Sequence, residues 1–213
     1  MPVHLMGHAA DVSIVRKEAH GAGAVVVEDA CEAHGTTLDG HQVGTFGDLS
    51  VFSFMFAHHM TTIEGGMLCS KSDEVADVFR MFRAHGWVRE TSDHFKSKVV
   101  RAFPDIHPSF LFADLGLNVR PTELVGAFGV HQLEKLPRFV EARRSAFFEI
   151  LRGLSEHEEH LILFPETVRE RLSPFAFPVV VRKESPFKAK DLMMFLEKRL
   201  IEIHRIAHGF KPL

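Results

Sequence analysis

The alternation of short apolar runs with longer helical patterns is the feature that most constrains the fold of this chain. Four runs are typical of strands: AVVVEDA (24–30), LSVFSF (49–54), GGMLCS (65–70) and FAFPVVVR (175–182). Helical patterns cover residues 11–23, 72–86, 120–136, 137–154 and 189–200, with Asp11 and Ser72 as the expected caps of the first two. Strands that alternate with helices predict the α/β class with a mainly parallel sheet.

The remaining stretches refine this outline. Asp39-Gly40 predicts a tight turn, and the polar stretch 87–111, with Pro104 and Pro108, predicts a long loop. The helix from about residue 137 is expected to link two domains. We therefore predict that residues 1–136 belong to a large domain, and that residues 137–213 form a linking helix with an incomplete small domain.

Composition excludes several classes of function. The net charge of -3 is spread over both signs without a basic stripe, so neither nucleic acid nor a membrane surface is expected as a partner. No apolar run reaches membrane-spanning length and no leader is evident, which predicts a cytoplasmic protein. Two cysteines are too few for a disulfide framework. The pair His157 and His160 lacks the spacing of a metal motif, so no metal is expected.

Polar residues gather where predicted strands end. Glu28-Asp29, Glu32 and the stretch 53–58 all follow apolar runs, and ligands of open α/β sheets bind outside the carboxyl ends of strands. A carboxylate there needs a partner against the cost of burial. The protonated pyridine nitrogen of a pyridoxal cofactor would be one partner. The alternative is that Asp29 caps the turn after its strand.

Three long stretches resemble one family. They are PVHLMGHAADVSIVRKEAHGAG (2–23), VVVEDACEAHGTTLDGHQVGTFGDLSVFSF (25–54) and GLNVRPTELVGAFGVHQLEKLPRFVEARR (116–144). In order and spacing they resemble the DegT/DnrJ/EryC1/StrS family of sugar aminotransferases. The resemblance implies part of the type I aspartate-aminotransferase fold, pyridoxal 5'-phosphate or pyridoxamine 5'-phosphate as cofactor, and a homodimer.

The resemblance also implies roles for individual residues. Asp29 would pair with the pyridine nitrogen, and Glu32 stands where the aminotransferases usually carry Gln beside the ring hydroxyl. Ser53 would bind the cofactor phosphate. Asn118 would reach the phosphate of the neighbouring subunit's cofactor. Arg120 has two open interpretations, a contact near the substrate or interface and an ion pair at a helix start.

The stretch SFMFAHHMTTIEGGM (53–67) sets the chain apart from the aminotransferases. His58 occupies the position of the Lys that binds the cofactor covalently in that family. Imidazole cannot form that bond, but it takes up a proton near neutral pH. AHHMTTIEGG resembles the branch of nucleotide-sugar 3-dehydratases. His59 is expected behind the site or in a structural role. His85 is expected near the site or as a helix C-terminal residue.

The resemblance implies a mechanism. Pyridoxamine phosphate would be held without a covalent bond, and its amine would join the 4-keto group of a nucleotide-linked 4-keto-6-deoxy sugar. His58 would move the proton, and the returning electrons would expel the C3 hydroxyl. Relatives acting on CDP-linked sugars carry an iron–sulfur cluster on a cysteine-rich loop. Residues 87–112 contain no cysteine, so no iron–sulfur cluster is expected. The chemistry should then follow the GDP-sugar enzymes, where L-glutamate regenerates the amine.

Some features depart from the family pattern. Ile63 replaces a Gly, and Met55-Phe56 replaces Tyr-Pro. The chain matches roughly the middle half of a family member and lacks the N-terminal phosphate-binding loop, so an open apolar sheet edge is expected. Two alternatives therefore remain. One is a non-catalytic fragment or remnant of this family. The other is a nucleotide-sugar aminotransferase, which would need another Lys at the cofactor.

Overall fold

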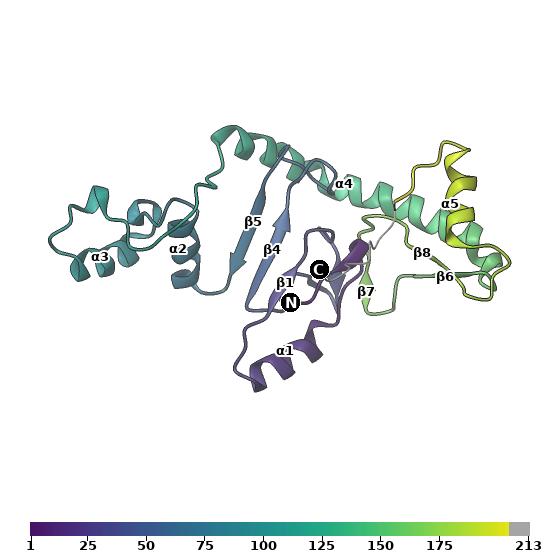
Figure 1. Ribbon diagram of the computed structural model, residues 1–213, viewed down its shortest axis with the longest axis horizontal. Coiled ribbons are helices and arrows are strands. Elements are labelled where there is room, and N and C mark those ends of the chain that lie inside the picture. Colours follow the sequence, from purple (N-terminus) through teal and green to yellow (C-terminus); the bar gives the residue numbers. More distant parts are fainter. Residues whose placement is uncertain (205–213) are drawn as a thin grey trace.

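A three-stranded sheet lies in the middle of the molecule. The computed structural model describes residues 1–204, and Figure 1 shows this sheet between helices α1 and α4. Its strands are β1 (Val27–Asp29), β4 (Leu49–Ser53) and β5 (Gly66–Ser70), in the order β1-β4-β5. All three coincide with predicted strands.

The direction of the strands differs in part from the prediction. β1 and β4 are parallel, with Asp29 opposite Val51, and a parallel bridge joins Val3 to Asp29. β4 and β5 are antiparallel, with Ser53 opposite Gly66. The expectation of a mainly parallel sheet is therefore met only between β1 and β4. No helix stands between β4 and β5, and a chain that returns directly forms an antiparallel pair.

Two smaller sheets are antiparallel throughout. β2 (Thr37–Leu38) pairs with both β3 (His41–Gln42) and β7 (Glu170–Arg171). Asp39 and Gly40 form the predicted turn between β2 and β3, with φ of 50° and 79°. Positive φ at both residues is the geometry that a two-residue hairpin prefers. The third sheet pairs β6 (Leu161–Leu163) with β8 (Val179–Val181), which is shorter than the predicted strand 175–182.

Helix starts agree with the predicted caps. α1 (Val12–Gly21) begins after Asp11, whose side chain accepts the Ser13 N–H, and α2 (Asp73–Phe82) begins after Ser72, whose side chain accepts the Val75 N–H. α5 (Ala189–Glu197) lies within the predicted helix 189–200. Short 3-10 turns cover η1 (Leu5–Gly7), η2 (Val88–Glu90), η3 (Pro108–Phe110) and η4 (Ser155–His157).

The predicted loop 87–111 is wrong, because it contains the helix α3 (Asp93–Ala102). Ser92 caps this helix by accepting the Phe95 N–H. Phe95, Val99 and Val100 pack against a small core of buried residues, Met81, Val88 and Leu111. The tertiary contact stabilises a helix whose own sequence is polar on most sides.

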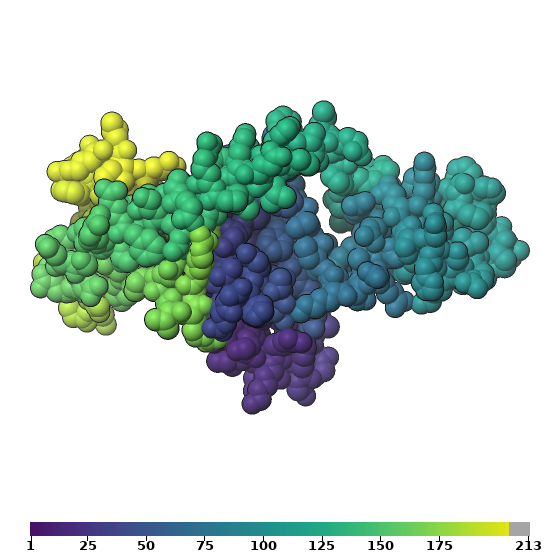
Figure 2. All heavy atoms as spheres, turned by 180° about the vertical axis from the view of Figure 1, so that it is seen from behind, coloured from purple at the N-terminus to yellow at the C-terminus, as the bar shows by residue number. Residues whose placement is uncertain are grey.

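The two predicted helices 120–136 and 137–154 form one helix, α4 (Glu123–Leu154). Pro137 lies inside it, where the sequence suggested a start. Its missing N–H removes one hydrogen bond, and the long helix continues around it. Seen from behind in Figure 2, α4 runs along one side, from the α2–α3 end of the molecule to the end that holds β6, β8 and α5. The boundary at residues 136/137 stays a prediction, and residues 205–213 lie outside the described part.

Several apolar side chains of the sheet and of α4 face outward. Met67 and Leu68 on β5 and Phe128 on α4 are about half exposed, and Leu124 on α4 is mostly exposed. Among residues 1–204, β5 pairs only with β4, so its other edge is open. This agrees with the open apolar sheet edge expected from the sequence.

Candidate active site

His58 lies in the turn after β4 and faces the loop after β1. Its Nδ1 is 2.5 Å from the carbonyl oxygen of Cys31, and its backbone N–H donates to the carbonyl of Met55. A carbonyl oxygen only accepts, so Nδ1 carries a hydrogen, and in the neutral ring the lone pair lies on Nε2, which has no hydrogen-bond partner among residues 1–204. The half-buried ring therefore presents one nitrogen that can take up a proton.

Asp29, Glu32 and Ser53 lie at the carboxyl ends of β1 and β4. Asp29 Oδ1 accepts the Cys31 N–H at 3.1 Å, which is the turn-capping contact weighed from the sequence. A carboxylate has about four acceptor positions, so capping leaves Asp29 free for a second partner. Glu32 Oε2 accepts the Met6 N–H at 2.8 Å, and Ser53 Oγ accepts the Met55 N–H at 3.3 Å.

His59 is buried behind His58 and stands next to His34. The Nε2–H of His59 donates to the carbonyl of Ser173 at 3.1 Å, while its Nδ1 has no partner among the described residues. Neither ring nitrogen of His34 has a partner there, and its ring packs against those of Phe52 and His59.

The surroundings keep both of these buried rings neutral. Burial lowers the pKa of His34 to about 4, with a smaller effect of His58. Burial also lowers the pKa of His59 to about 4, followed by the positive charge of Arg143. A neutral, buried imidazole is suited to a structural role behind His58, which is the role that the sequence suggested for His59.

Glu28 belongs to the framework of the site. It is fully buried and accepts hydrogen bonds from the backbone N–H groups of Gly44 and Gly47 and from His4 Nε2 at 3.0 Å. His4 Nδ1 accepts the Ala10 N–H, so its hydrogen lies on Nε2 and the ring is neutral. Burial acts to raise the pKa of Glu28, but the bonds from His4, Gly47 and Gly44 outweigh it and hold the pKa below its usual value.

His85, Asn118 and Arg120 form a second group, which makes no hydrogen bond or ion pair with His58 or Asp29 in the described part of the chain. The backbone N–H of His85 donates to the carbonyl of Leu117. Asn118 Oδ1 accepts from Arg120 Nε at 3.2 Å, and Arg120 lies 3.8 Å from the carboxylate of Glu90. Arg120 therefore makes the ion pair that was one of its two interpretations. The three residues are exposed.

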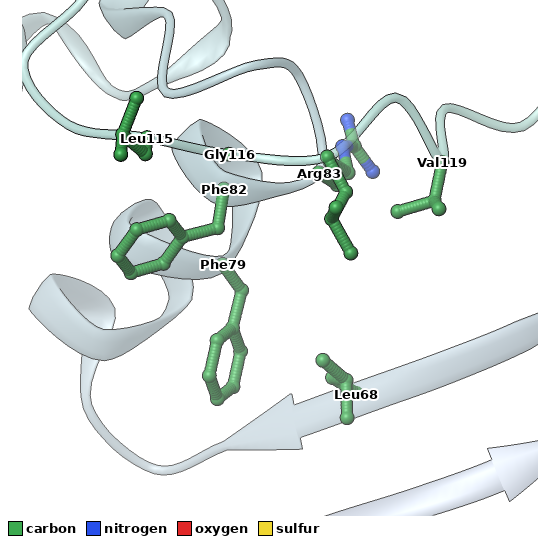
Figure 3. Close-up of a pocket in the computed structure, with 8 residues that line it drawn as sticks. Leu68, Phe79, Phe82, Arg83, Leu115, Gly116 and Val119 are labelled. Carbon is green, nitrogen blue, oxygen red and sulfur yellow. The ribbon is translucent and has the colours of Figure 1, made fainter.

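An apolar hollow of about 400 Å³ adjoins this second group (Figure 3). Phe79 and Phe82 of α2 and Leu68 of β5 line it, together with Leu115 and Leu117. Figure 3 shows the rings of Phe79 and Phe82 projecting from the helix, with Leu68 on the neighbouring strand. Residues of the His58 group do not line it, so this hollow and the candidate active site are separate.

Ile63 adopts a backbone conformation that suits glycine. Its φ is 76°, and its side chain is 62% exposed. A β-branched residue in the left-handed region is strained. The Gly expected at this position in the family would avoid that strain, so the departure noted in the sequence has a structural cost.

The structure adds neighbours of His58 that the sequence did not indicate. The ring centroid of Phe175 lies 5.2 Å from that of His58 and 5.9 Å from that of His59. Ser173 and Phe175 stand more than 110 positions further along the chain, and no motif links them to the histidines. Only tertiary packing could identify them.

The residues at this sheet end fit a pyridoxal-type cofactor. Asp29 offers a carboxylate for a protonated ring nitrogen, and His58 offers a free Nε2. The Ser53 hydroxyl accepts one backbone bond and still has its own hydrogen to donate toward a phosphate.

Residues 1–204 hold no cluster of three or more His, Cys, Asp or Glu side chains arranged for a metal ion. None of their helices combines the length and apolar character that crossing a bilayer requires.

Comparison with known proteins places these observations in context. The sequence model of the DegT/DnrJ/EryC1/StrS aminotransferase family matches residues 1–209. GDP-4-keto-6-deoxy-D-mannose 3-dehydratase of Yersinia pseudotuberculosis is 33% identical over 209 residues, which are 98% of this chain and 52% of that protein.

Solved structures agree with this match. The Escherichia coli GDP-4-keto-6-deoxy-D-mannose-3-dehydratase with bound hydrated PLP superposes with a TM-score of 0.80 at 32% identity, covering 94% of this chain and 51% of that one. A GDP-4-keto-6-deoxymannose-3-dehydratase with a trapped PLP-glutamate geminal diamine gives 0.79 at 32% identity, with the same coverage. The chain thus spans about half the length of the relatives it matches.

Proposed function

The chain belongs to the DegT/DnrJ/EryC1/StrS aminotransferase family, and from that premise we propose that it is all or part of a 3-dehydratase that acts on a nucleotide-linked 4-keto-6-deoxy sugar. The observation that carries the proposal is the geometry of His58. Its Nδ1–H is bound to the Cys31 carbonyl and its Nε2 has no partner in the described part of the chain, at the position where the aminotransferases carry their Lys. GDP-4-keto-6-deoxy-D-mannose, named for the relative of 33% identity, is the first substrate to test.

Each residue of the site has a defined task in this proposal. His58 Nε2 takes up a proton and returns it, which suits an imidazole because its ordinary pKa lies near neutrality. Asp29 holds the hydrogen of a protonated ring nitrogen, Ser53 donates to a phosphate, and Glu32 lies beside the ring hydroxyl. When bound, pyridoxamine 5'-phosphate would supply an amino group for the sugar's keto carbon and an electron-accepting ring.

The proposal includes partners. L-glutamate is the proposed amino donor, supported by the PLP-glutamate adduct trapped in a relative of 32% identity. A homodimer is proposed because Asn118 lies in an exposed group that makes no hydrogen bond with His58 among residues 1–204. In a dimer, Asn118 would serve the neighbouring subunit's cofactor, with Arg120 and His85 beside it.

The test compares cofactor retention and product formation. The chain is purified, soaked with pyridoxamine phosphate and, in a parallel sample, with pyridoxal phosphate, whose aldehyde could form an imine with a lysine, and is then desalted and examined by absorption spectroscopy. It is then given GDP-4-keto-6-deoxy-D-mannose and glutamate, and loss of the C3 hydroxyl is followed by mass spectrometry. We expect a retained absorption band that borohydride does not fix to a lysine, because no Lys stands at position 58.

His58→Asn is the decisive variant. Removal of a general base typically costs about 10²–10⁴-fold in rate, so the dehydration rate should fall at least about a hundredfold with the cofactor band retained. Unchanged dehydration would exclude the proton-transfer role of His58. A folded chain without a cofactor band would support the fragment alternative. A lysine adduct, or a 4-amino sugar as product, would support an aminotransferase.

A further inference from the structure

A four-residue segment, Leu172–Phe175, crosses the back of the His58 turn. Ser173 accepts the Nε2–H of His59 through its carbonyl, and the ring of Phe175 lies against that of His58, with centroids 5.2 Å apart and planes at 48°. The segment follows β7 and comes from the part of the chain beyond α4. Within the described residues, this segment thus brings the predicted small domain against His58.

The segment is fixed from the side of the N-terminus. The backbone N–H of Phe175 donates to the carbonyl of Met6 at 3.0 Å. The Ser173 N–H donates to the hydroxyl of Thr36, which itself donates to the carbonyl of Gly7. A Cβ at Gly7, whose φ is 93°, would lie 2.1 Å from the Ser173 carbonyl oxygen, so the two backbones approach as closely as glycine alone permits.

The segment is also fixed from α4. Arg143 Nη1 donates to the Phe175 carbonyl at 2.8 Å and to that of Pro174 at 3.4 Å, and Arg144 Nη1 donates to the Leu172 carbonyl. Arg143 is half-buried, and burial lowers its pKa. Among residues 1–204, Arg143 forms no ion pair with a carboxylate, whereas Arg144 pairs with Glu166. A guanidinium placed among carbonyls forms strong directed bonds, which suits a role in holding a backbone segment.

We propose that Phe175 is a positioning residue for His58, held in place by Arg143. The Phe175 ring presses the imidazole against the Cys31 carbonyl and so maintains the form with hydrogen on Nδ1 and a free Nε2. Without the ring, the imidazole can rotate or exchange its hydrogen to Nε2. The inference rests on the proposed function for its meaning in catalysis, because a base with hydrogen on Nε2 has no lone pair there to receive a proton.

The test observes the His58 ring directly and needs neither cofactor nor substrate. Long-range ¹H–¹⁵N spectra of the whole chain above the ordinary histidine pKa distinguish the two neutral forms of each ring, and His58→Asn assigns the signal by its loss. We expect the wild-type His58 to show a hydrogen-bearing Nδ1. In Phe175→Leu the ratio of the two forms should fall about fivefold, as expected when one ordinary hydrogen bond is lost.

Two variants serve as controls. Phe175→Tyr keeps the ring and should keep the wild-type spectrum. Phe177→Leu removes a ring from the same region that packs on Phe147 at 4.9 Å, and it too should leave the His58 signal unchanged. An unaltered ratio in Phe175→Leu, or a wild-type His58 with hydrogen on Nε2, would overturn the proposal.

A second route is available if Phe175→Leu does not fold. Arg143→Lys keeps the charge, but its side chain is one bond shorter and does not place a donor where Nη1 meets the carbonyls of Pro174 and Phe175, so the ratio should move in the same direction by a smaller factor. No change in Arg143→Lys would then refute the proposal. If dehydration is absent while the spectra behave as expected, the proposed function fails and the positioning of His58 stands.

Discussion

The two groups of predicted site residues differ in how the chain holds them. The His58 group has contacts with the N-terminal turn, the loop after β1 and the segment Leu172–Phe175 of the same chain. The His85–Asn118–Arg120 group is exposed and borders an apolar hollow with open side chains such as Leu115.

This difference indicates what each group requires. The His58 group is held by contacts within the chain, so the stability of the fold should be sensitive to changes in the buried polar groups around it. The second has little internal support, and its apolar surroundings are the kind of surface that another polypeptide covers. Four predictions test the contrast, from the largest expected effect to the smallest.

The strongest expected effect is a loss of stability in mild acid. His34 and His59 have a pKa of about 4 in the fold, while the unfolded chain binds these protons near the ordinary value of 6.5. Between these values the unfolded state binds more protons, so stability falls as the pH drops through this window and is flat above it for these two groups. The slope should reach about 1.4 kcal/mol per pH unit for each ring.

Urea unfolding at successive pH values measures this slope. The double variant His34→Phe with His59→Leu should flatten it. His85→Gln, in the exposed group, should leave it as in the wild type. An equal slope in the double variant would show that other groups cause the acid sensitivity.

Glu28→Ala should destabilise the fold by about 3–5 kcal/mol. The change leaves His4 and the N–H groups of Gly44 and Gly47 without their buried acceptor. Glu90→Ala is the matched change in the other group, where the carboxylate pairs with Arg83 and Arg120 at a partly exposed place. It should cost no more than about 1 kcal/mol. Similar losses in both variants would remove the distinction between the two groups.

Ile63→Gly should stabilise the chain by about 1 kcal/mol. The substitution relieves a β-branched residue at φ 76°, and the gain exceeds the added freedom of the unfolded chain. Ile14→Gly, at another exposed isoleucine but inside α1, should instead destabilise by about 1 kcal/mol. Thermal unfolding of the two variants shows whether each substitution raises or lowers stability. A loss of stability in both would contradict the strain at Ile63.

Leu115→Ser should have the smallest effect, within about 0.5 kcal/mol, because the side chain is 91% exposed in this chain. Leu111→Ser is the matched change four positions earlier, where the leucine is fully buried against Met81 and Val88. It should cost about 3 kcal/mol or more. A large loss in Leu115→Ser would mean that the hollow is already covered in solution, for example by a second copy of the chain.

Much of the framework could be predicted from the sequence. The runs 24–30, 49–54 and 65–70 contain β1, β4 and β5, and Asp11 and Ser72 cap the helices that they were expected to cap. These features depend on neighbouring residues, so local pattern reveals them. The family and its branch followed from motifs of the same kind, and the family assignment is confirmed.

The errors arose where distant contacts decide the local structure. α3 is polar by sequence and forms because Phe95 and its neighbours meet the core of Met81, Val88 and Leu111. α4 continues through Pro137, because packing elsewhere along a long helix outweighs one missing hydrogen bond. The direction of β5 depends on the connection after β4, which an apolar run by itself does not reveal.

The sequence alone determined the position of His58 where a lysine was expected, and with it the kind of chemistry that this site can support. The tertiary structure decided which ring nitrogen is free and what holds the ring, through Cys31, Phe175 and Arg143. The physical reason is distance along the chain. The sequence shows that residue 58 is a histidine. Which of its ring nitrogens carries the hydrogen depends on hydrogen bonds and packing with residues 27 to 117 positions away.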